Sequence, residues 1–504
     1  MPDASDIKIR PTTNIHELPF TADELLRVLL RLAPGRGAQI LDSGGARGVD
    51  EARFLIAGFD PFETIEARGE ELLIERRGET TARGERGSLI SLLDERLARY
   101  RVRRGAGASS PELPFSGGAC IASFAYDLAR QFERLRSRPP VAPESDAPPE
   151  PDAALAFYDT LVIHDYARGS TYLTTDAGEE QLARARAALD EARRTTALEE
   201  ARRTCGFDDD AAAGAGGRRL TTTATSNFTR AGYAAAVRRI KRHIYAGDIY
   251  QANLTQQFTC PLSAGDRAER VFLRLRRAHP ASFAAFLRRR RDTVISASPE
   301  RFLRVTPDEA GGARCVEAWP IKGTRARGAT AEEDARLREE LRRSAKDAAE
   351  NVMIVDLLRN DLGRVCRYGT IEVGALCEVQ EHPTLFHLVS KVRGHLRPEV
   401  SAGELLRATF PCGSITGAPK LRAMEIIDDC ESAPRGLSMG AVGYFSFDGR
   451  IDLSVAIRTM TVRARMARFN VGGGIVAESD PEAEYEESLV KARALLSALG
   501  ARIV

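Results

Sequence analysis

Hydrophobic and polar positions follow two rhythms along the chain, and these rhythms predict where helices and strands lie. Apolar residues recur every three or four positions in FTRAGYAAAVRRIKRHIYAGD (228–248), which is typical of an amphipathic helix that ends at Gly247. ERVFLRLRRAHP has the same spacing and stops at Pro280. We interpret the longer segment TAEEDARLREELRRSAKDAAENVMIVDLLRNDLGRV as one helix or two.

Apolar runs bounded by turn residues predict strands in the same part of the chain. IYQANLTQQFTC is one, and DTVISASPERFLRV and GARCVEAWPI are predicted to pair across the loop TPDEAGG. Later strands are predicted over SMGAVGYFSF, GRIDLSVAIRTMTVRARM and RFNVGGGIVAESD, before a last helix over PEAEYEESLVKARALLSAL. Strand pairs interleaved with long helices predict an α+β fold with layered packing, and not a series of βαβ units.

Two segments interrupt these patterns. RSRPPVAPESDAPPEPDA (136–153) is too rich in proline for a helix or a central strand. CGFDDDAAAGAGGRRLTTTATSN (205–227) is rich in glycine and threonine around an acidic run. We therefore expect an N-terminal region over 1–204, a flexible linker over 205–227 and a second region over 228–504.

Composition narrows the class of protein. The formal net charge of +2, from 73 basic and 71 acidic residues among 504, argues against a nucleic-acid partner. Eight cysteines contain no C-x-x-C pair, which favours neither a zinc site nor a disulfide framework and is typical of a reducing cytoplasm. The chain begins without an apolar run and has no segment of about 20 apolar residues, so we expect no membrane association. A cytoplasmic enzyme of small molecules fits best.

Two acidic helices offer ligands for a metal ion. Asp347 and Glu350 are three residues apart and so share one helix face, and Glu484 and Glu487 repeat this spacing. Magnesium prefers carboxylate oxygens and keeps several waters, so one carboxylate from each helix could hold it against an anionic substrate. The alternative is solvated surface acids, with Glu487 pairing only with Lys491 four residues on.

Glycine-rich segments and one arginine indicate an anion site. FPCGSITGAPKLRAMEII (410–427) is a glycine loop that leads into a helix, where free N–H groups favour a small anion; a plain helix start is the alternative. NVGGGIV (470–476) predicts close backbone approach by a ligand or a neighbouring strand. Arg458 lies in the apolar segment SVAIRTM, where it needs an acidic partner unless the strand is at an edge.

Glu300, Lys322 and His387 complete the candidate chemistry. A carboxylic acid near an amine in a dry cleft suits acid catalysis beside nucleophilic attack, provided that burial raises the pKa of Glu300 and lowers that of Lys322. A structural ion pair would place the same two residues together. His387, in TLFHLVSKV, lines the cleft or is an ordinary core histidine.

The chain from Phe228 to its end resembles the chorismate-utilising enzymes, whose members form anthranilate, isochorismate, salicylate or aminodeoxychorismate. Seven motifs carry the resemblance: SPERF, PIKGTRARG, DAAENVMIVDLLRNDLGRV, FHLVSKVRG, FPCGSITGAPKLRAMEIID, GAVGYFSFDGRIDLSVAIRT and GGGIVAESDPEAEYEESLVKA. RFLIAGFDPF and ACIASFAYDL, in the N-terminal region, resemble the amino-transferring branch more loosely. The resemblance implies an anthranilate-synthase-like chorismate-binding fold, with two interlocked sheet-and-helix halves and the active site between them, and makes 228–504 the catalytic region.

The motif PIKGT implies a branch within this family. Anthranilate-forming members resemble PIAGT here, whereas the lysine of PIKGT is the nucleophile of aminodeoxychorismate-forming members. Carried onto this chain, Lys322 attacks C2 of chorismate, Glu300 protonates the departing 4-hydroxyl, and ammonia enters at C4. The product would be 4-amino-4-deoxychorismate, for p-aminobenzoate and folate synthesis.

The resemblance also implies the remaining site residues. Glutamine at position 251, where water-adding relatives place an activating lysine, argues against a water-adding reaction. The implied Mg²⁺ ligands are Glu350 and Glu487, supported by Asp347 and Glu484. The implied substrate contacts are Gln251, Thr324, His387, Thr416, Gly417, Arg458, Gly472, Gly474 and Lys491.

Departures from the family pattern define the alternatives. Ser438 stands where the family usually has a substrate-contacting tyrosine, and LDSGG (41–45) matches the tryptophan-binding segment of relatives only partly. The chain has no G-x-C-x-G glutaminase signature, so ammonia is expected from a separate glutamine amidotransferase subunit or from free ammonium. The alternatives are an anthranilate-forming enzyme, a secondary-metabolism paralogue that makes the same product, and a non-catalytic binding protein.

Overall fold

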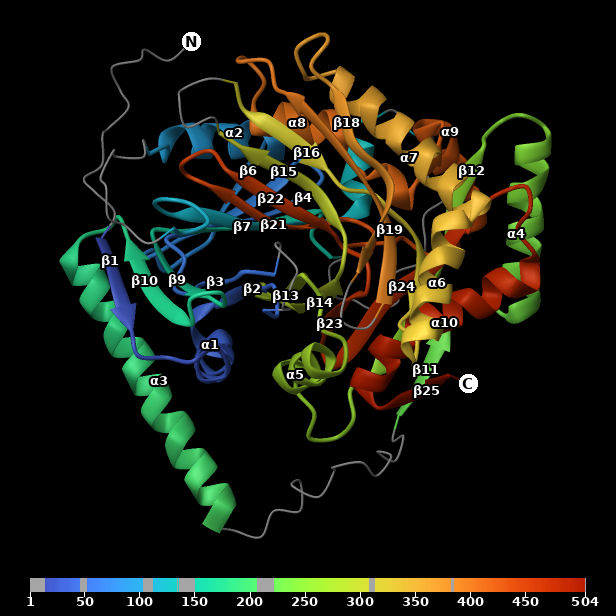
Figure 1. Ribbon diagram of the computed structural model, residues 1–504. Helices are drawn as coiled ribbons and strands as arrows, with labels where there is room; N and C mark the ends of the chain where they lie inside the picture. The colour runs from blue at the N-terminus through green and yellow to red at the C-terminus, as the bar shows by residue number, and fades with distance from the viewer. Residues whose placement is uncertain are drawn as a thin grey trace.

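Two large, mainly antiparallel sheets face one another, and helices cover the outer face of each (Figure 1). The computed structural model describes residues 14–45, 52–102, 112–133, 135, 150–205, 222–307, 313–381 and 385–503. The α+β layered fold predicted from the sequence is confirmed. None of the helices within these ranges is long and apolar enough to cross a membrane.

The first sheet has 13 strands and joins segments from both ends of the chain. Its order is β1 (Asn14–Leu18), β10 (Ser170–Thr175), β9 (Thr160–Asp165), β3 (Phe54–Gly58), β2 (Gln39–Asp42), β13 (Phe283–Arg288), β14 (Thr293–Ser298), β23 (Thr459–Arg463), β24 (Met466–Ile475), β12 (Gln251–Pro261), β11 (Thr222–Ser226) and β25 (Ala501–Ile503), with β20 (Gly417–Ala418) paired to β12. The N-terminal strands β2 and β3 thus continue directly into strands of the later region.

The second sheet has 12 strands and also combines strands from the N-terminal and later regions of the chain. Its order is β17 (Ile321–Ala326), β19 (Leu385–His395), β16 (Cys315–Ala318), β15 (Arg301–Thr306), β22 (Ile451–Val455), β21 (Ala441–Ser446), β7 (Ala119–Phe124), β8 (Ala153–Tyr158), β4 (Glu63–Arg68), β5 (Glu71–Arg76) and β6 (Arg83–Arg86), with β18 (Glu372–Glu381) paired to β19. The predicted antiparallel pair around TPDEAGG is β15 and β16.

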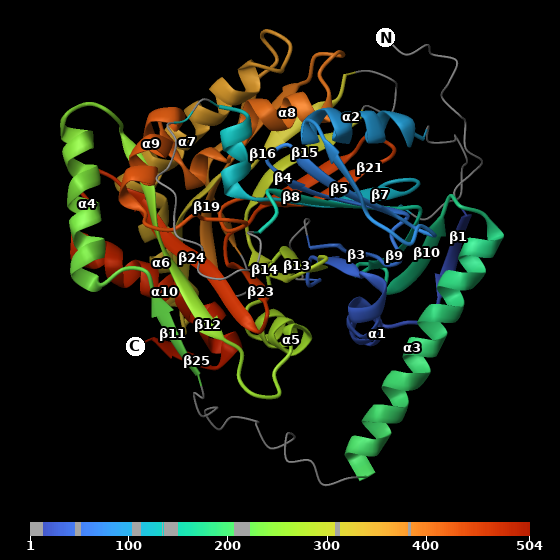
Figure 2. The ribbon, with the colours of Figure 1, turned by 180° about the vertical axis from the view of Figure 1, so that it is seen from behind.

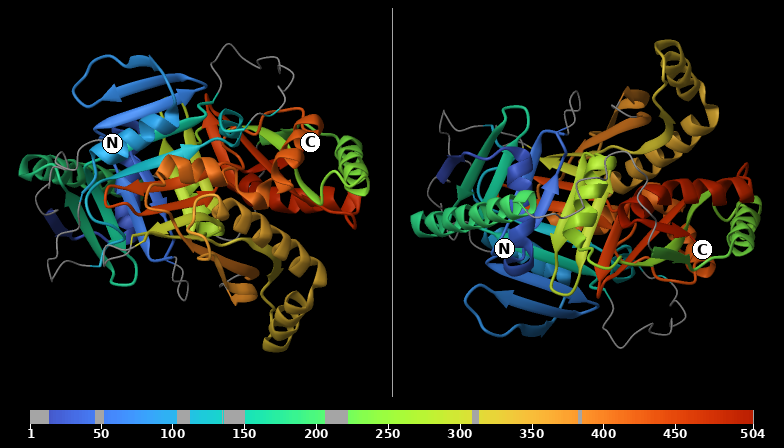
Figure 3. Two further views of the ribbon diagram at one scale, coloured as in Figure 1. Left: turned by 90° about the horizontal axis from the view of Figure 1, so that it is seen from above. Right: turned by 90° about the horizontal axis from the view of Figure 1, so that it is seen from below.

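The helices form two outer layers. Against the 12-stranded sheet pack α2 (Leu89–Arg99), α7 (Ala345–Gly363) and α8 (Ala402–Thr409). Against the 13-stranded sheet pack α1 (Ala22–Arg36), α3 (Glu179–Cys205), α5 (Ala268–Ala278) and α10 (Pro481–Leu499). The end near β12 carries α4 (Arg230–Tyr245) and α9 (Lys420–Cys430), and α6 (Ala331–Arg343) lies over β17 to β19. Views from behind, above and below place α3 and α4 at opposite ends of the molecule (Figures 2 and 3).

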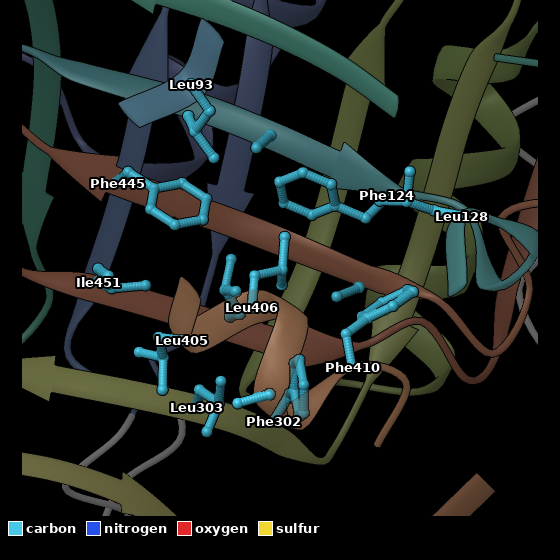
Figure 4. Packing of buried hydrophobic residues seen from close by; sticks show 14 of the residues in the cluster. Leu93, Phe124, Leu128, Phe302, Leu303, Leu405, Leu406, Phe410, Phe445 and Ile451 are labelled. Carbon is cyan, nitrogen blue, oxygen red and sulfur yellow. The ribbon is translucent and has the colours of Figure 1, made fainter. Parts of the chain in front are cut away.

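Apolar side chains join these layers. Phe302 of β15 packs with Phe410 and with Leu405 and Leu406 of α8 in the core of the 12-stranded sheet (Figure 4). A separate cluster, with Ile56, Ile121 and Ile163 among its members, fills the space between the two sheets. Burial of this surface, at about 25 cal/mol per Å², holds the sheets face to face.

The chain crosses between the two sheets at two places where the sequence predicted continuous strands. DTVISASPERFLRV divides into β14 and β15 around Glu300, and GRIDLSVAIRTMTVRARM divides into β22 and β23 around Arg458. A single strand was the wrong prediction for each segment, because the hydrophobic pattern continues through the crossing. Arg458 has a φ of 47°, which redirects the chain at that point.

Other predictions are refined by the structure. The long acidic segment is two helices, since Ser344 ends α6 and caps α7, its hydroxyl accepting a hydrogen bond from the Asp347 N–H. The linker predicted over 205–227 falls mostly outside the described residues; its last residues form β11. The division at 204 and 228 stays a prediction.

Candidate active site

The candidate site is built around the two crossings between the sheets. The carbonyl of Glu300 accepts a hydrogen bond from the N–H of Val455 at 3.0 Å, and the carbonyl of Arg458 accepts one from Ala297 at 3.1 Å. Ser298 adds a side-chain bond to the carbonyl of Val455 at 2.6 Å. These bonds join the two crossings, so the main chains of Glu300 and Arg458, 158 positions apart in the sequence, are fixed side by side.

Lys322 lies on β17, at a bulge in its pairing with β19. The bulge depends on Gly323, which has a φ of 75°. A Cβ at this position would lie 2.8 Å from Leu341 and 2.9 Å from Asp347. The Lys322 ammonium donates to the carbonyl of Ser414 at 3.4 Å. The glycine thus lets the lysine turn inward while α6 and α7 pack closely behind it.

Glu300 is buried, with 5% of its surface exposed. Burial raises its pKa to about 7, and the Ser414 side chain, the charge of Lys322 and the Ile321 N–H only partly oppose this increase. Its Oε1 has no hydrogen-bond partner among the described residues. A carboxyl group that is half-protonated near neutral pH, with one oxygen unpaired, can donate a proton to a ligand.

Strand β12 and its neighbours form another wall of the site. Both amide atoms of Gln251 are buried without a partner in the part of the chain that the structure describes. Gly417 pairs with Ala252 of β12, and a Cβ on Gly474 would lie 2.6 Å from Nε2 of Gln251, so a side chain there would displace the Gln251 amide. Because buried polar groups normally have hydrogen-bond partners, the unpaired amide is a candidate to bind a ligand.

A side chain at position 472 would meet a different part of the molecule from one at position 473. A Cβ on Gly472 would lie 1.8 Å from the carbonyl oxygen of Leu254, so the close approach there is made by the neighbouring strand. The carbonyl of Gly472 accepts a hydrogen bond from Lys491 at 2.9 Å. Gly473 faces the acidic helix, since its Cβ would lie 3.2 Å from Oε2 of Glu484.

Thr416, Thr324 and His387 have partners within the protein. The Thr416 hydroxyl donates to the carbonyls of Cys412 and Gly413 at 3.1 and 3.3 Å, which holds the glycine loop closed. The hydroxyl of Thr324, on β17, hydrogen-bonds to Nδ1 of His387, on β19, at 3.0 Å. This pair lies one residue beyond the bulge that positions Lys322.

Three glutamates from α7 and α10 face a common space. Burial and the charges of Asp347 and Glu484 raise the pKa of Glu350, against Lys322 and Lys346. Burial also raises the pKa of Glu484, with help from Glu487. Burial also acts to raise the pKa of Glu487, but the charges of nearby lysines outweigh this effect, so the pKa is lowered. The largest of these contributions comes from Lys491, whose Nζ lies 2.7 Å from Oε1 of Glu487.

These carboxylates fit a hard divalent cation. Their mutual repulsion disfavours three negative charges in a partly buried space, and a cation would relieve it. No group of three or more His, Cys, Asp or Glu side chains in the described ranges is arranged to hold a metal by itself. Two glutamates with substrate and water oxygens match the way in which proteins bind Mg²⁺. Asp347 is turned aside, since it pairs with Arg325 at 3.3 Å.

Arg458 is mostly buried, and no carboxylate pairs with it within the described residues. Burial alone lowers its pKa. An unpaired guanidinium in such a place is costly in free energy, and a bound anion would offset that cost. The edge-strand alternative does not apply, because Arg458 lies between two sheets.

Some residues of the site were not predicted from the sequence. Ser414 contacts Lys322, and Asn253 has a buried Nδ2 without a partner among the described residues. Lys346 acts on all three glutamates. Ser438, in the usual tyrosine position, accepts a hydrogen bond from Asn470 N–H at 3.1 Å and donates one to the carbonyl of Thr459 at 3.4 Å.

Comparisons with known proteins find relatives along most of the chain. The model of the chorismate binding enzyme family matches residues 47–497. Aminodeoxychorismate synthase component 1 of Klebsiella aerogenes is 38% identical, over 96% of this chain and 98% of that protein. Anthranilate synthase component 1 of Acetivibrio thermocellus is 33% identical over 89% of this chain and 87% of that protein.

A solved structure supports the same relationship. Anthranilate synthase component I from Streptococcus pneumoniae superposes with a TM-score of 0.69 and 28% identity, over 89% of this chain and 93% of that one. The family model covers most of the described chain, including most strands of both sheets and every candidate residue named above. The chain therefore belongs to the family of chorismate binding enzymes.

Proposed function

We propose that this chain is the synthase component that converts chorismate and ammonia to 4-amino-4-deoxychorismate, for p-aminobenzoate and folate synthesis. The observation that carries the proposal is the proximity of Lys322 to Glu300, since the charge of Lys322 opposes the rise in the pKa of Glu300. An amine and a carboxyl group with a pKa of about 7 lie within electrostatic reach in a buried site. This pair can supply a nucleophile and a proton donor to one substrate.

The first half of the reaction forms a covalent adduct. The Lys322 amine attacks C2 of chorismate, and a new C2–N bond forms as the ring double bonds shift toward C4. The C4–O bond breaks, and Glu300 gives its proton to the departing hydroxyl, which leaves as water. The direct replacement at C4 is thereby divided into two steps, each on an activated carbon.

The second half of the reaction releases the product and regenerates the free enzyme. Ammonia attacks C4, the double bonds shift back, and the C2–N bond to Lys322 breaks. The Glu300 carboxylate, left without its proton by the first half, accepts one from the incoming nitrogen. The sum is chorismate plus ammonia giving 4-amino-4-deoxychorismate plus water, with both residues restored.

The binding groups follow from the unpaired polar atoms of the site. The Arg458 guanidinium would pair with the enolpyruvyl carboxylate, next to the main chain of Gly472 and Gly474. The loop that contains Thr416 and Gly417 would receive the ring carboxylate. The Gln251 amide would hydrogen-bond to the ring substituents, and a glutamine cannot serve there as a base for a water molecule.

Mg²⁺ fits this chain through Glu350 and Glu487. When bound, it supplies positive charge that neutralises the ring carboxylate of chorismate. Glu484 supports Glu487 from the same helix, and Ser479 holds Glu484 by a hydrogen bond of 2.6 Å. Lys491 would release Glu487 to the metal while keeping its bond to Gly472.

Ammonia would come from a separate glutamine amidotransferase subunit. Two considerations support this: similar proteins carry the name component 1, and the sequence lacks a G-x-C-x-G glutaminase signature. Anthranilate formation is the competing activity, since anthranilate synthases are also similar to this chain. Lys322 disfavours it, because that reaction adds ammonia at C2, the carbon that the lysine would occupy.

Product analysis tests the proposal. The purified chain is incubated with chorismate, Mg²⁺ and ammonium at alkaline pH, and the products are separated by chromatography with mass detection. We expect an aminated product that keeps its enolpyruvyl group. Anthranilate with released pyruvate would overturn the assignment and leave family membership intact.

A further inference from the structure

A cavity of about 810 Å³ lies among elements of the N-terminal region. Its lining comes from α1 and α3, from β4, β5 and β8, and from the turn between β13 and β14 (Figure 2). The described residues that line it include none of those proposed to bind chorismate or Mg²⁺, and none of LDSGG (41–45). The cavity has the size of an ordinary small-molecule site and has no part in the proposed function.

The wall formed by β4 and β8 carries one buried carboxylate. Ala154 and Ala156 of β8 line the cavity with small side chains. Glu66 of β4 also lines it and is 7% exposed. Among the described residues its hydrogen-bond donor is Arg68, which reaches Oε2 at 3.4 Å. That single long bond leaves Oε1 of Glu66 to accept a hydrogen bond from another group.

Gln39 adds a second hydrogen-bond acceptor to the cavity. It is the first residue of β2 and is 6% exposed, and its Oε1 has no partner among the described residues. Its cross-strand neighbour, Leu287, belongs to the cluster between the two sheets, so the Gln39 side chain points into the same space. Because buried amides normally have partners, an open acceptor in a cavity wall indicates a ligand with N–H or O–H donors.

Arg288 supplies the opposite kind of group at the turn between β13 and β14. It lines the cavity, and its N–H donates to the carbonyl of Ala38 at 3.3 Å, which places it beside the start of β2. Its guanidinium donates to the Thr293 hydroxyl at 2.7 Å, and no carboxylate in the described ranges pairs with it. The next residue, Arg289, is instead bonded to both oxygens of Asp292. The Arg288 guanidinium is therefore available to an anion.

We propose that this cavity is a second binding site, for a small organic acid that carries an amino group at the end remote from its carboxylate. The amino group would donate to Gln39 and Glu66, and the carboxylate would pair with Arg288. The apolar body of the ligand would lie against Ala154 and Ala156. An α-amino acid matches less well, because its amino and carboxylate groups share one carbon. The inference goes beyond the proposed function and does not depend on it.

Binding of p-aminobenzoate to the full-length chain tests the inference. Its ring separates a carboxylate from an uncharged amine that can donate two hydrogen bonds. Benzoate lacks the amine and aniline lacks the carboxylate, so the three compounds test the two ends of the site separately. By isothermal titration calorimetry we expect p-aminobenzoate to bind at least about tenfold more tightly than either of the others.

Two substitutions locate the binding in this cavity. Gln39→Leu removes the buried acceptor and Arg288→Gln removes the guanidinium, and each should weaken the binding of p-aminobenzoate by at least about tenfold. Gln39→Leu should be at least as stable as wild type in urea, since an apolar side chain replaces a buried amide that has no partner.

Two further variants are controls. Arg291→Gln changes an exposed arginine of the same turn that does not line the cavity, and it should leave the affinity for p-aminobenzoate unchanged. Arg458→Gln alters the candidate active site, and it should also leave this affinity unchanged.

The outcomes separate this inference from the proposed function. Preferential binding of p-aminobenzoate that is weakened in Gln39→Leu and Arg288→Gln, and kept in both controls, supports the second site. The inference is overturned by no binding to wild type at millimolar concentration, by equal binding of the three compounds, by unchanged binding in Gln39→Leu and Arg288→Gln, or by loss in Arg458→Gln alone. Anthranilate as the reaction product would refute the proposed function and leave the binding result valid.

Discussion

The main chain of Glu300 is bonded to that of Val455, whose N–H donates to the Glu300 carbonyl at 3.0 Å. Each residue lies where the chain leaves one sheet for the other. The matching bond from Ala297 to Arg458 makes the two crossings a single braced unit. The proposed acid and the proposed carboxylate-binding arginine are therefore positioned by backbone, which leaves their side chains available for a ligand.

Gly323→Ala should destabilise the protein and lower its activity. Alanine at a φ of 75° is strained, and its Cβ would also clash with Leu341 and Asp347. We expect a loss of about 2–4 kcal/mol in the free energy of unfolding, measured by urea denaturation. Gly247→Ala is the control, since Gly247 has a φ of 78° with no heavy atom within 4 Å of the Cβ position. It should lose only about 1 kcal/mol, and equal losses would show that the packing behind Lys322 is loose.

Glu300→Gln should change how stability depends on pH. With a folded-state pKa of about 7, above its unfolded value, Glu300 contributes stability in full at pH 4 and loses it as the pH rises through 7. Glutamine does not titrate, so the variant should gain about 3 kcal/mol relative to wild type between pH 4 and 8, measured by urea denaturation. A constant difference across this range would mean that Glu300 has an ordinary pKa.

Glu350→Gln and Glu487→Gln should each weaken the dependence of activity on Mg²⁺. Removal of one carboxylate ligand is expected to raise the Mg²⁺ concentration for half-maximal activity by at least about tenfold. Glu486→Gln is the matched control on the same helix, because Glu486 points to Arg230 at 2.8 Å and is 53% exposed. Equal Mg²⁺ requirements in all three variants would argue against the assigned ligands.

Arg458→Gln should raise KM for chorismate while leaving the protein at least as stable as wild type. The guanidinium is mostly buried without a carboxylate partner in the described ranges, so its removal relieves a desolvation cost. We expect KM to rise by at least about tenfold, as for the loss of a charge-assisted hydrogen bond to a carboxylate.

Arg289→Gln provides the contrast to Arg458→Gln. Arg289 is more deeply buried and bonds to both oxygens of Asp292, at 2.6 and 2.8 Å, in the turn between β13 and β14. Its replacement should cost about 3–5 kcal/mol of stability with KM unchanged. If Arg458→Gln were destabilised to the same extent, Arg458 would have a structural role.

The sequence predicted the elements of the later region well, because α4, α5 and α10 have regular apolar spacing and β12 is bounded by clear turn residues. It could not reveal the two crossings, since the apolar pattern runs without a break through Glu300 and Arg458. The reversal at Arg458 is visible only as a positive φ.

The sequence predicted those residues of the candidate site that belong to recognisable motifs. Spacing along α7 and α10 identified the pairs Asp347 with Glu350 and Glu484 with Glu487, and the resemblance singled out Glu350 and Glu487 as metal ligands. Burial raises the pKa of Glu350 and lysines lower that of Glu487, and the role of the two residues as ligands stays a prediction. The reason for Gly472 was ambiguous in sequence, and the structure assigns its close contact to Leu254 of the neighbouring strand. The carbonyl of Ser414 accepts a hydrogen bond from Lys322, and a main-chain contact of this kind leaves no signature in residue identity.

Covalent trapping at Lys322 tests the central claim most directly. The purified chain is mixed with chorismate and Mg²⁺ in the absence of ammonium, quenched, digested and examined by mass spectrometry, with Lys322→Ala in parallel. We predict that the peptide containing Lys322 gains the mass of chorismate less one water, and that Lys322→Ala forms neither adduct nor aminated product. An unmodified Lys322, together with full aminating activity in Lys322→Ala, would contradict a covalent lysine mechanism.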